Sequence, residues 1–432
     1  MKITGNQSGE NRIEVDSLSG RIRSFVLNKS VLLLFVLFCG IGVIYARQPA
    51  NYIVDQVVTR FFRNIILILS LIVPVWAGMG LNFSIVVGAM SAQAGLIIML
   101  NHRLSGIGGI AVAFAASIPI AVLLGWLTGR LFNKTKGQEM ITGMILGYFA
   151  NGVYQLIFMY LCGSIIPIKN QDMVLSGMGI NGTITFDQDI SGALDNLLKL
   201  TLDQVLWVLL ALMAIAFCAK ILARFRNKQK LDFKKTMLPL YSIALAAIVL
   251  AVLLHFSDSF VFLCHYVRVP AVTAILVGLV CLFISFLSNT KLGSDIMTVG
   301  QNMQIARTAG IQVNRIRIIA IIISTMSAAL GQVVYLQNLG TLTTYSAADQ
   351  IGTFSVAALL VGGASIKKAN IGQAICGAIL FHLMFIVAPI AGKNIFGDAL
   401  YGEYFRVFIS YGVIAVALAL HAWKTVTESR KK

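Results

Sequence analysis

A series of long apolar runs constrains this chain more than any other feature. A single helix needs about 20 apolar residues to cross the hydrocarbon core of a bilayer, and about 17 suffice. The chain has 432 residues, of which 58% are hydrophobic and only 12% charged, and its mean hydropathy is +0.84. A soluble domain carries roughly 25% charged residues. These values predict a polytopic membrane protein and exclude an ordinary soluble enzyme.

The runs predict an all-α fold with ten to twelve transmembrane helices. Three of them, 83–100, 351–365 and 371–391, are rich in Gly, Ala and Ser and are candidates for short or re-entrant helices. The full set, some members being marginal in length, is 31–46, 64–80, 83–100, 107–127, 140–161, 204–219, 238–255, 270–287, 317–336, 351–365, 371–391 and 407–423.

The distribution of Lys and Arg predicts the orientation. Of the 34 basic residues, 25 fall on one side if both termini share that side with the stretches 128–139, 220–237, 288–317 and 366–370. The positive-inside rule then places both termini in the cytoplasm. The net charge of +17 follows from this bias and does not indicate nucleic acid. The basic stretch Arg224–Lys235 is expected to be an orientation signal that lies near anionic lipid headgroups.

This topology divides the chain into three parts. Residues 1–30 are predicted to be a polar cytoplasmic segment, 31–423 a transmembrane domain, and 424–432 a basic cytoplasmic tail. On the opposite side, the largest segment is 162–203. Two interpretations of it remain open, a solvated loop and a contact surface for an external partner.

The loop 288–317 is longer than a simple reversal between two helices requires. Ile305, Ala309 and Val313 recur at i, i+4 and i+8, with polar residues between them. This spacing predicts a short helix with one apolar side and one polar side. On the cytoplasmic face, such a helix would offer a docking surface to a partner.

The same loop carries the chain's most specific resemblance to a known family. Gly300-Gln-Asn-Met-Gln-Ile-Ala-Arg-Thr-Ala-Gly-Ile311 resembles the coupling loop of ABC importer permeases for branched-chain amino acids, ribose, simple sugars and nucleosides. The similarity extends through Asn314-Arg-Ile-Arg317 and includes Ser355–Ser365. The segment Gly137–Tyr148 is similar to the sugar and nucleoside branch. Val299 departs mildly from the family, which often has Ala there.

The resemblance implies the permease subunit of an ATP-driven importer in the cell membrane, most simply for a sugar or nucleoside. It implies three kinds of partner: ABC ATPase subunits, a second permease of the same or a related chain, and an extracytoplasmic solute-binding protein. ATP and Mg²⁺ would be bound by the ATPase, and this chain would need no cofactor. The positions that match the coupling motif are Gly300, Asn302, Ala306, Arg307, Gly310 and Ile311.

Motifs for catalysis are not found in the sequence. No G-x-x-x-x-G-K-[ST] phosphate loop occurs, so the chain itself is not expected to hydrolyse ATP. The six cysteines form no C-x-x-C pair, and no metal site is predicted. The histidines at 255 and 382, inside the runs, are expected to be hydrogen-bonded core residues.

The alternative function is an ion-coupled secondary transporter of a small solute. Such a carrier usually needs ionisable groups or broken helices at membrane depth. All 17 carboxylates fall outside the predicted runs, and Glu139 lies next to the edge of one of them. This distribution favours the importer.

Polar side chains inside the runs are the candidates for a substrate path. Tyr148, Asn151 and Gln155 share one helix face, and Asn82 and Gln93 flank a run of small residues. Two interpretations are open for each group. The residues either line a path for a neutral polar solute or hold neighbouring helices together.

Overall fold

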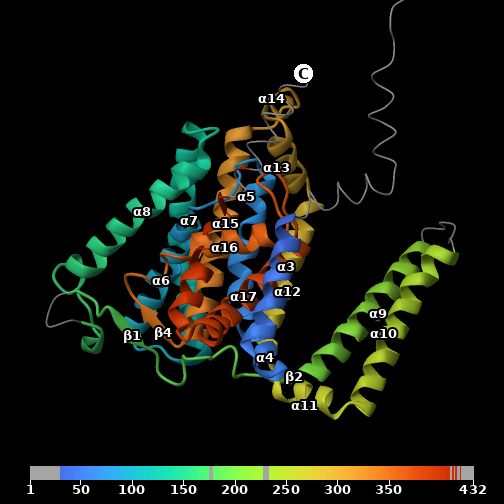
Figure 1. The fold of residues 1–432 in the computed structure, drawn as a ribbon. Helices are drawn as coiled ribbons and strands as arrows, with labels where there is room; N and C mark the ends of the chain where they lie inside the picture. Colours follow the sequence, from blue (N-terminus) through green and yellow to red (C-terminus); the bar gives the residue numbers. More distant parts are fainter. Residues whose placement is uncertain are drawn as a thin grey trace, which may run out of the picture.

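The computed structural model describes residues 30–408 except 175–178 and 227–232, and also residues 411, 412, 414, 415 and 419. The fold is almost entirely helical (Figure 1). The long helices are α3 (Ser30–Ala46), α4 (Ala50–Leu69), α6 (Ile85–Asn101), α7 (Gly106–Lys134), α8 (Glu139–Leu156), α9 (Leu202–Arg226), α10 (Phe233–Phe256), α12 (Ala271–Ser288), α15 (Val313–Leu339) and α17 (Ile371–Phe396). The shorter helices are α5 (Ile72–Trp76), α11 (Asp258–Tyr266), α13 (Lys291–Gln301), α14 (Met303–Thr308) and α16 (Ile351–Val361).

The all-α polytopic fold class is confirmed. Among the described residues, 6 helices are long and apolar enough to cross a membrane, or up to 7 if the pair α10–α11, bent by 102°, is one crossing. Four shorter apolar helices accompany them, including α6 and α16. The predicted run 371–391 is a full-length helix that continues to Phe396. The predicted run 407–423 lies largely outside the described residues.

The sequence placed the start of one helix incorrectly. The predicted run 64–80 corresponds to α4, which begins at Ala50 and continues through α5 to Trp76. Asp55, Arg60 and Arg63 therefore lie within an apolar helix, and the prediction that every carboxylate avoids the spanning segments was wrong. Residues 1–29 and 420–432 are outside the described residues, so the cytoplasmic location of both termini stays a prediction.

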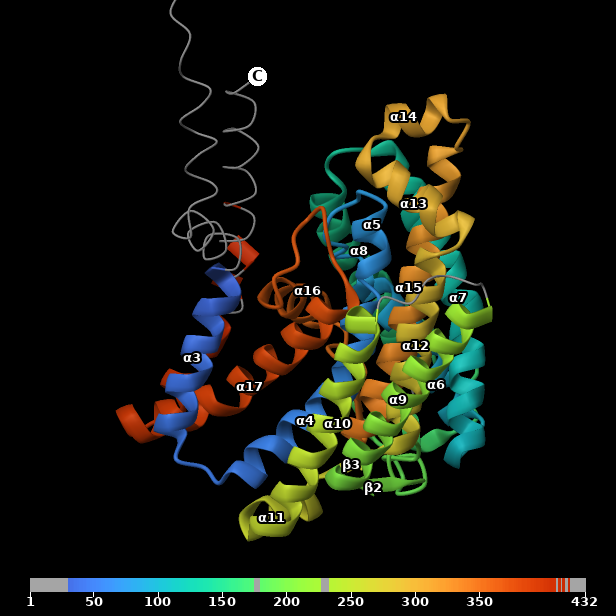
Figure 2. The same cartoon turned by 90° about the vertical axis from the view of Figure 1, so that its right-hand side faces the viewer.

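Helix α15 lies at the centre of the molecule, where it packs against α4, α5, α6 and α7 (Figures 1 and 2). Its buried residues form one face in the first half of the helix and surround the helix from Ala328 to Gln337, where it has neighbours on more sides. In contrast, α8 leans away from this centre on one side, and the hairpin of α9 and α10 lies apart on the other.

Glycines allow the close approach of α15 to α6 and α7. A Cβ atom at Gly88 of α6 would lie 2.6 Å from the Thr325 carbonyl oxygen. At Gly129 of α7 it would lie 2.8 Å from the Ile318 Cα. Lipid tails are as apolar as the side chains, so such close contact is a principal source of helix association in a membrane.

Two short two-stranded sheets lie at the end of the molecule opposite α14 (Figure 1). Strand β1 (Thr183–Thr185) pairs with β4 (Thr341–Thr343), and β2 (Lys199–Thr201) pairs with β3 (Arg268–Pro270), both antiparallel. The strands attach the long segment that precedes α9 to the ends of α15 and α12.

A buried carboxylate strengthens this attachment. The Asp195 side chain accepts a hydrogen bond from Thr273 Oγ1 at 2.5 Å, from Gln337 Nε2 at 3.0 Å and from Asn338 Nδ2 at 2.5 Å. Arg63 Nε of α4 in turn donates to Asn338 Oδ1. Residues of α12 and α15 therefore meet at the Asp195 side chain, which is how a buried charge is ordinarily compensated.

A matched pair of glycine substitutions tests the close packing of α15. Gly129→Ala should lower the free energy of unfolding by about 1–3 kcal/mol, because the added methyl group meets backbone atoms that cannot move aside. Gly152→Ala in α8 is the control, since its Cβ would have nothing within 4 Å. Thermal unfolding of the purified variants in detergent would measure both, and equal melting temperatures would contradict the packing argument.

Candidate coupling turn and polar cavity

The residues 300–311, called the coupling turn from here on, form a sharp corner between two helices rather than one helix. Helix α13 ends at Gln301, and Asn302 is extended, with φ −157° and ψ 111°. The Asn302 side chain then caps α14 by accepting from the backbone N–H groups of Gln304 and Ile305, at 2.8 and 3.2 Å. An Asn at this position is among the best N-caps, which explains why the chain turns here.

Two glycines in the coupling turn have different physical roles. A Cβ atom at Gly300 would lie 1.9 Å from the Trp76 carbonyl oxygen, so Gly300 permits α13 to contact the end of α5. Gly310 has φ +79°, in the left-handed region that side chains disfavour, and has open space around it. Gly310 therefore ends the turn after α14 because it adopts this backbone conformation, and not because another segment packs closely against it.

The exposed side of the coupling turn differs from the predicted one. Ile305 is 59% exposed, whereas Ala306 is fully buried and Val313 nearly so. The predicted apolar side of Ile305, Ala309 and Val313 was wrong, because α14 ends at Thr308 and Val313 already belongs to α15. The turn presents Ile305, Arg307 and Thr308 outwards instead, while Ile311 N–H donates to the Ala306 carbonyl oxygen and closes its base.

Basic side chains gather beside the coupling turn. Lys136, in the loop between α7 and α8, donates from Nζ to Asn314 Oδ1 at 2.8 Å. Desolvation lowers the pKa of Lys136 below its ordinary value, and the nearby charges of Arg307 and Arg317 lower it further. The exposed side chains of Lys136 and Arg307 suit a partner that brings acidic groups.

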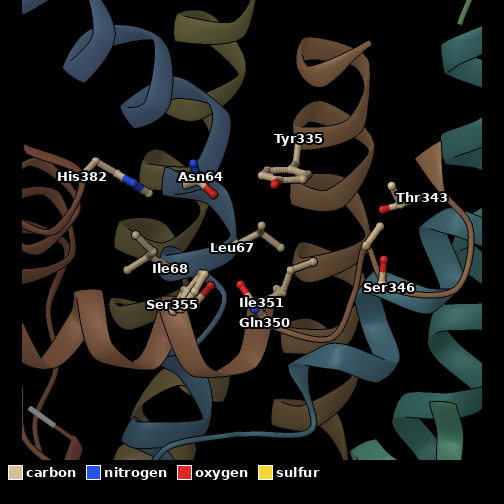
Figure 3. A pocket seen from close by; sticks show the side chains of 12 residues that line it. Asn64, Leu67, Ile68, Tyr335, Thr343, Ser346, Gln350, Ile351, Ser355 and His382 are labelled. Atoms are coloured by element: carbon tan, nitrogen blue, oxygen red, sulfur yellow. The ribbon is translucent and has the colours of Figure 1, made fainter. Parts of the chain in front are cut away.

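A polar cavity of about 180 Å³ lies in the other half of the molecule (Figure 3). Its wall combines residues of α4, α15, α16 and α17 with the loop that follows β4. The lining residues are Asn64, Leu67, Ile68, Tyr335, Thr343, Ser346, Ala347, Gln350, Ile351, Phe354, Ser355 and His382. None of them carries a fixed charge, and amide and hydroxyl groups provide most of the polar atoms.

His382 does not have the environment that the sequence predicted. It is buried in α17 and lines the cavity, where Figure 3 shows its ring directed towards Asn64. Among the described residues, none makes a hydrogen bond with its Nε2 atom. A buried imidazole nitrogen without a partner is costly, and a bound polar molecule would compensate it.

The predicted path residues are divided between different environments. Tyr148 and Asn151 line a second cavity of about 320 Å³, which shares Gln350 with the first. Asn151 Nδ2 donates to Asp349 Oδ1 at 2.9 Å, and partial desolvation raises the pKa of this carboxyl group. Gln155, one turn further along α8, lines neither cavity.

The other two predicted path residues are buried between helices. Asn82 donates from Nδ2 to Ser324 Oγ at 3.2 Å and accepts from the Ser84 backbone N–H at 3.1 Å, so it joins the start of α6 to α15. Gln93 is 1% exposed within α6. Neither lines the cavities described above, which agrees with a packing role.

The cavity residues Asn64, Tyr335 and His382 were missed by the sequence analysis. Asn64 was placed at the edge of a run because α4 was predicted to start there, and His382 was interpreted as a core residue. Within the part of the chain that the structure describes, no group of three or more His, Cys, Asp or Glu side chains is placed to hold a metal ion.

Comparison with known proteins identifies the family. Residues 53–418 match the family described as branched-chain amino acid transport system / permease component, and the chain belongs to this family. It is an integral permease that crosses the inner membrane several times.

Two curated relatives are permeases of ABC transporters. The chain is 27% identical over 253 residues to the guanosine ABC transporter permease protein NupQ of Bacillus subtilis, covering 58% of this chain and 73% of that protein. It is 25% identical over 170 residues to the probable ABC transporter permease protein YphD of Escherichia coli, covering 39% of this chain and 48% of that protein. No solved structure matches the chain significantly.

Single-cysteine labelling tests whether the coupling turn and the segment beside β1 face opposite sides of the membrane. In a background without the six native cysteines, Ile305→Cys in the coupling turn should react only when the cytoplasmic face is open to an impermeant maleimide. Asn181→Cys, beside β1, should react in intact cells. Labelling of both positions from the same side would overturn the assignment of the turn to the cytoplasm.

Proposed function

We propose that this chain is the membrane-spanning permease of an ATP-driven importer for a small neutral solute, a nucleoside or a simple sugar. One observation carries the proposal: an exposed turn at one end of the molecule and an uncharged polar cavity towards the other are joined by the single helix α15. Arg317 lies near the start of α15, and Tyr335 lies four residues before its end.

The proposed mechanism is alternating access driven from the cytoplasm. Two ATPase subunits bind ATP and Mg²⁺, and their closure displaces the coupling turn. The permease works as a pair with a second copy or a related chain around a central path, and an extracytoplasmic solute-binding protein delivers the substrate. This chain supplies the path and needs no cofactor.

The chemistry of the cavity supports a neutral substrate. Asn64, Ser355 and His382 offer hydrogen bonds without a fixed charge, and Tyr335 and Phe354 offer aromatic faces. Sugars and nucleosides are rich in hydroxyl groups and have flat faces that stack on aromatic rings. The guanosine permease among the relatives supports the nucleoside more than the sugar.

Reconstituted transport would test the function directly. The permease, co-purified with its ATPase and placed in proteoliposomes, should accumulate a labelled nucleoside or sugar when the ATPase is supplied with ATP. A panel of both classes identifies the substrate, with a branched-chain amino acid included as a comparison. Uptake that persists without ATP but collapses with an uncoupler would instead support an ion-coupled carrier.

Removal of one cavity hydroxyl group should weaken substrate binding. Tyr335→Phe deletes a single hydrogen-bonding group with a net value of about 0.5–1.5 kcal/mol, so the apparent affinity for uptake should fall by about tenfold or less. Tyr401→Phe, at an exposed position outside the cavity, is the matched control. If Tyr335→Phe and His382→Phe each had an unchanged KM for uptake, the cavity would not be part of the substrate path.

Strain in the coupling turn should uncouple transport from ATP hydrolysis. Gly310→Val places a β-branched side chain at φ +79°, which costs of order 1–3 kcal/mol locally. Uptake should fall while membrane insertion is retained. Arg307→Glu should weaken co-purification of the ATPase, because it reverses an exposed charge. Normal uptake by a well-expressed Gly310→Val variant would exclude the turn from the mechanism.

A further inference from the structure

Arg317 is a buried cation at the base of the coupling turn. Its side chain is fully buried, and its guanidinium group donates to the Glu139 carboxylate and, at 3.2 Å, to the Phe132 carbonyl oxygen. Its Nη1 atom also lies 3.6 Å from the Met303 Sδ atom. Arg317 therefore joins its own helix α15 to the end of α7, the start of α8 and the start of α14.

Glu139 is also held in place by contacts other than the one with Arg317. It is the first residue of α8, and its second oxygen accepts from the Gly137 backbone N–H at 2.9 Å. A carboxylate at this position is also stabilised by the partial positive charge of the helix N-terminus. Asn133 and Lys136 both donate to Asn314, at 2.8 Å each, so the loop between α7 and α8 stays against the start of α15.

Helix α8 is the partner in this contact that can move. Only 11% of the most apolar part of Glu139–Leu161 is buried, compared with 56% for α15, and Figure 1 shows α8 leaning away from the other helices. Elements with few buried contacts require the least free energy to displace. Beyond Glu139, Tyr148 and Asn151 on α8 form one wall of the second cavity, and Asn151 is bonded to the loop at Asp349.

We propose that the Arg317–Glu139 ion pair is a positioning element that transmits displacement of the coupling turn to α8 and thereby moves the wall of the second cavity. The inference rests on the proposed function and adds to it a series of contacts through which the coupling turn moves α8. Movement of α14 acts on Arg317 through Met303, and Arg317 acts on the first turn of α8 through Glu139. The Asn151–Asp349 hydrogen bond then carries the motion to the loop that also lines the polar cavity.

The chemistry of the Arg317–Glu139 pair suits the orientation of two helices relative to each other better than it suits stabilisation of the fold. Removing two charges from water is costly, and apolar residues of similar size often stabilise a protein equally well or better. An ion pair with several hydrogen bonds, however, fixes the mutual orientation of its elements. Replacement of both residues by apolar side chains should therefore preserve the fold but prevent the displacement of the coupling turn from reaching α8.

The test is a double variant, Arg317→Met with Glu139→Leu, in the reconstituted complex with its ATPase. The number of substrate molecules transported per ATP hydrolysed should fall by about tenfold, within the range typical of coupling between two sites. ATPase co-purification and the melting temperature should stay close to those of the wild type. The matched control is Arg406→Met with Glu403→Leu, which removes an ion pair of 2.5 Å outside the coupling turn and should leave the ratio unchanged.

A second measurement does not depend on uptake. Spin labels at Gln301 on α13 and Ile145 on the exposed face of α8 should report a change in distance when ATP binds the complex. The change should be lost in the double variant. Glu139→Gln keeps the shape of the side chain and removes its charge, so it should reduce the distance change less than the double variant does. This single variant provides the test if the double variant does not assemble.

The outcomes separate this inference from the function on which it rests. A wild-type complex without ATP-dependent uptake would overturn the proposed function and the route together. Normal wild-type uptake, with an unchanged transport ratio and an unchanged distance response in the double variant, would overturn the route alone.

Discussion

The close approach of α15 to α6 and α7 is the constraint on which the rest of the structure depends. At Gly88 and Gly129, no side chain separates the helices, and Thr325 Oγ1 reaches the Ala121 carbonyl oxygen of α7 at 3.1 Å. In a bilayer this contact has to replace the hydrophobic force that assembles soluble cores. Because α15 is fixed on several sides, it provides a stable frame for both the coupling turn and the polar cavity.

The two sites use this frame in different ways. A helix of 27 residues is about 40 Å long, enough to cross the hydrocarbon core, so α15 can have one end at the coupling turn and the other near the cavity. The polar cavity is lined by α4, α15, α16, α17 and the loop after β4. In the proposed mechanism, the loop after β4 is the part of the cavity wall that moves, because Asp349 in this loop accepts a hydrogen bond from Asn151 of α8.

The fold class and a short helix within residues 300–311 could be predicted because they depend on local patterns. Apolar runs identify helices, and the spacing of Gly300, Asn302 and Gly310 marks a turn whose cap and left-handed residue the structure displays. The cavity could not be predicted in this way. Asn64, Tyr335 and His382 are far apart in sequence, and only helix packing brings them together. The Arg317–Glu139 pair was equally hidden, because the partners are 178 positions apart, and a charge at the edge of an apolar run is ordinarily interpreted as a headgroup contact.

The network around Asp195 has a consequence for biosynthesis. Asp195 is translated before all three of its side-chain partners; Thr273 follows 78 residues later, and Gln337 follows 142 residues later. Strand β1 is likewise translated before β4, the strand with which it pairs. This end of the molecule can therefore close only after α15 has left the ribosome and entered the membrane. A truncated chain that stops before α15 would expose an uncompensated carboxylate and an unpaired strand, which are features that quality-control proteases can recognise.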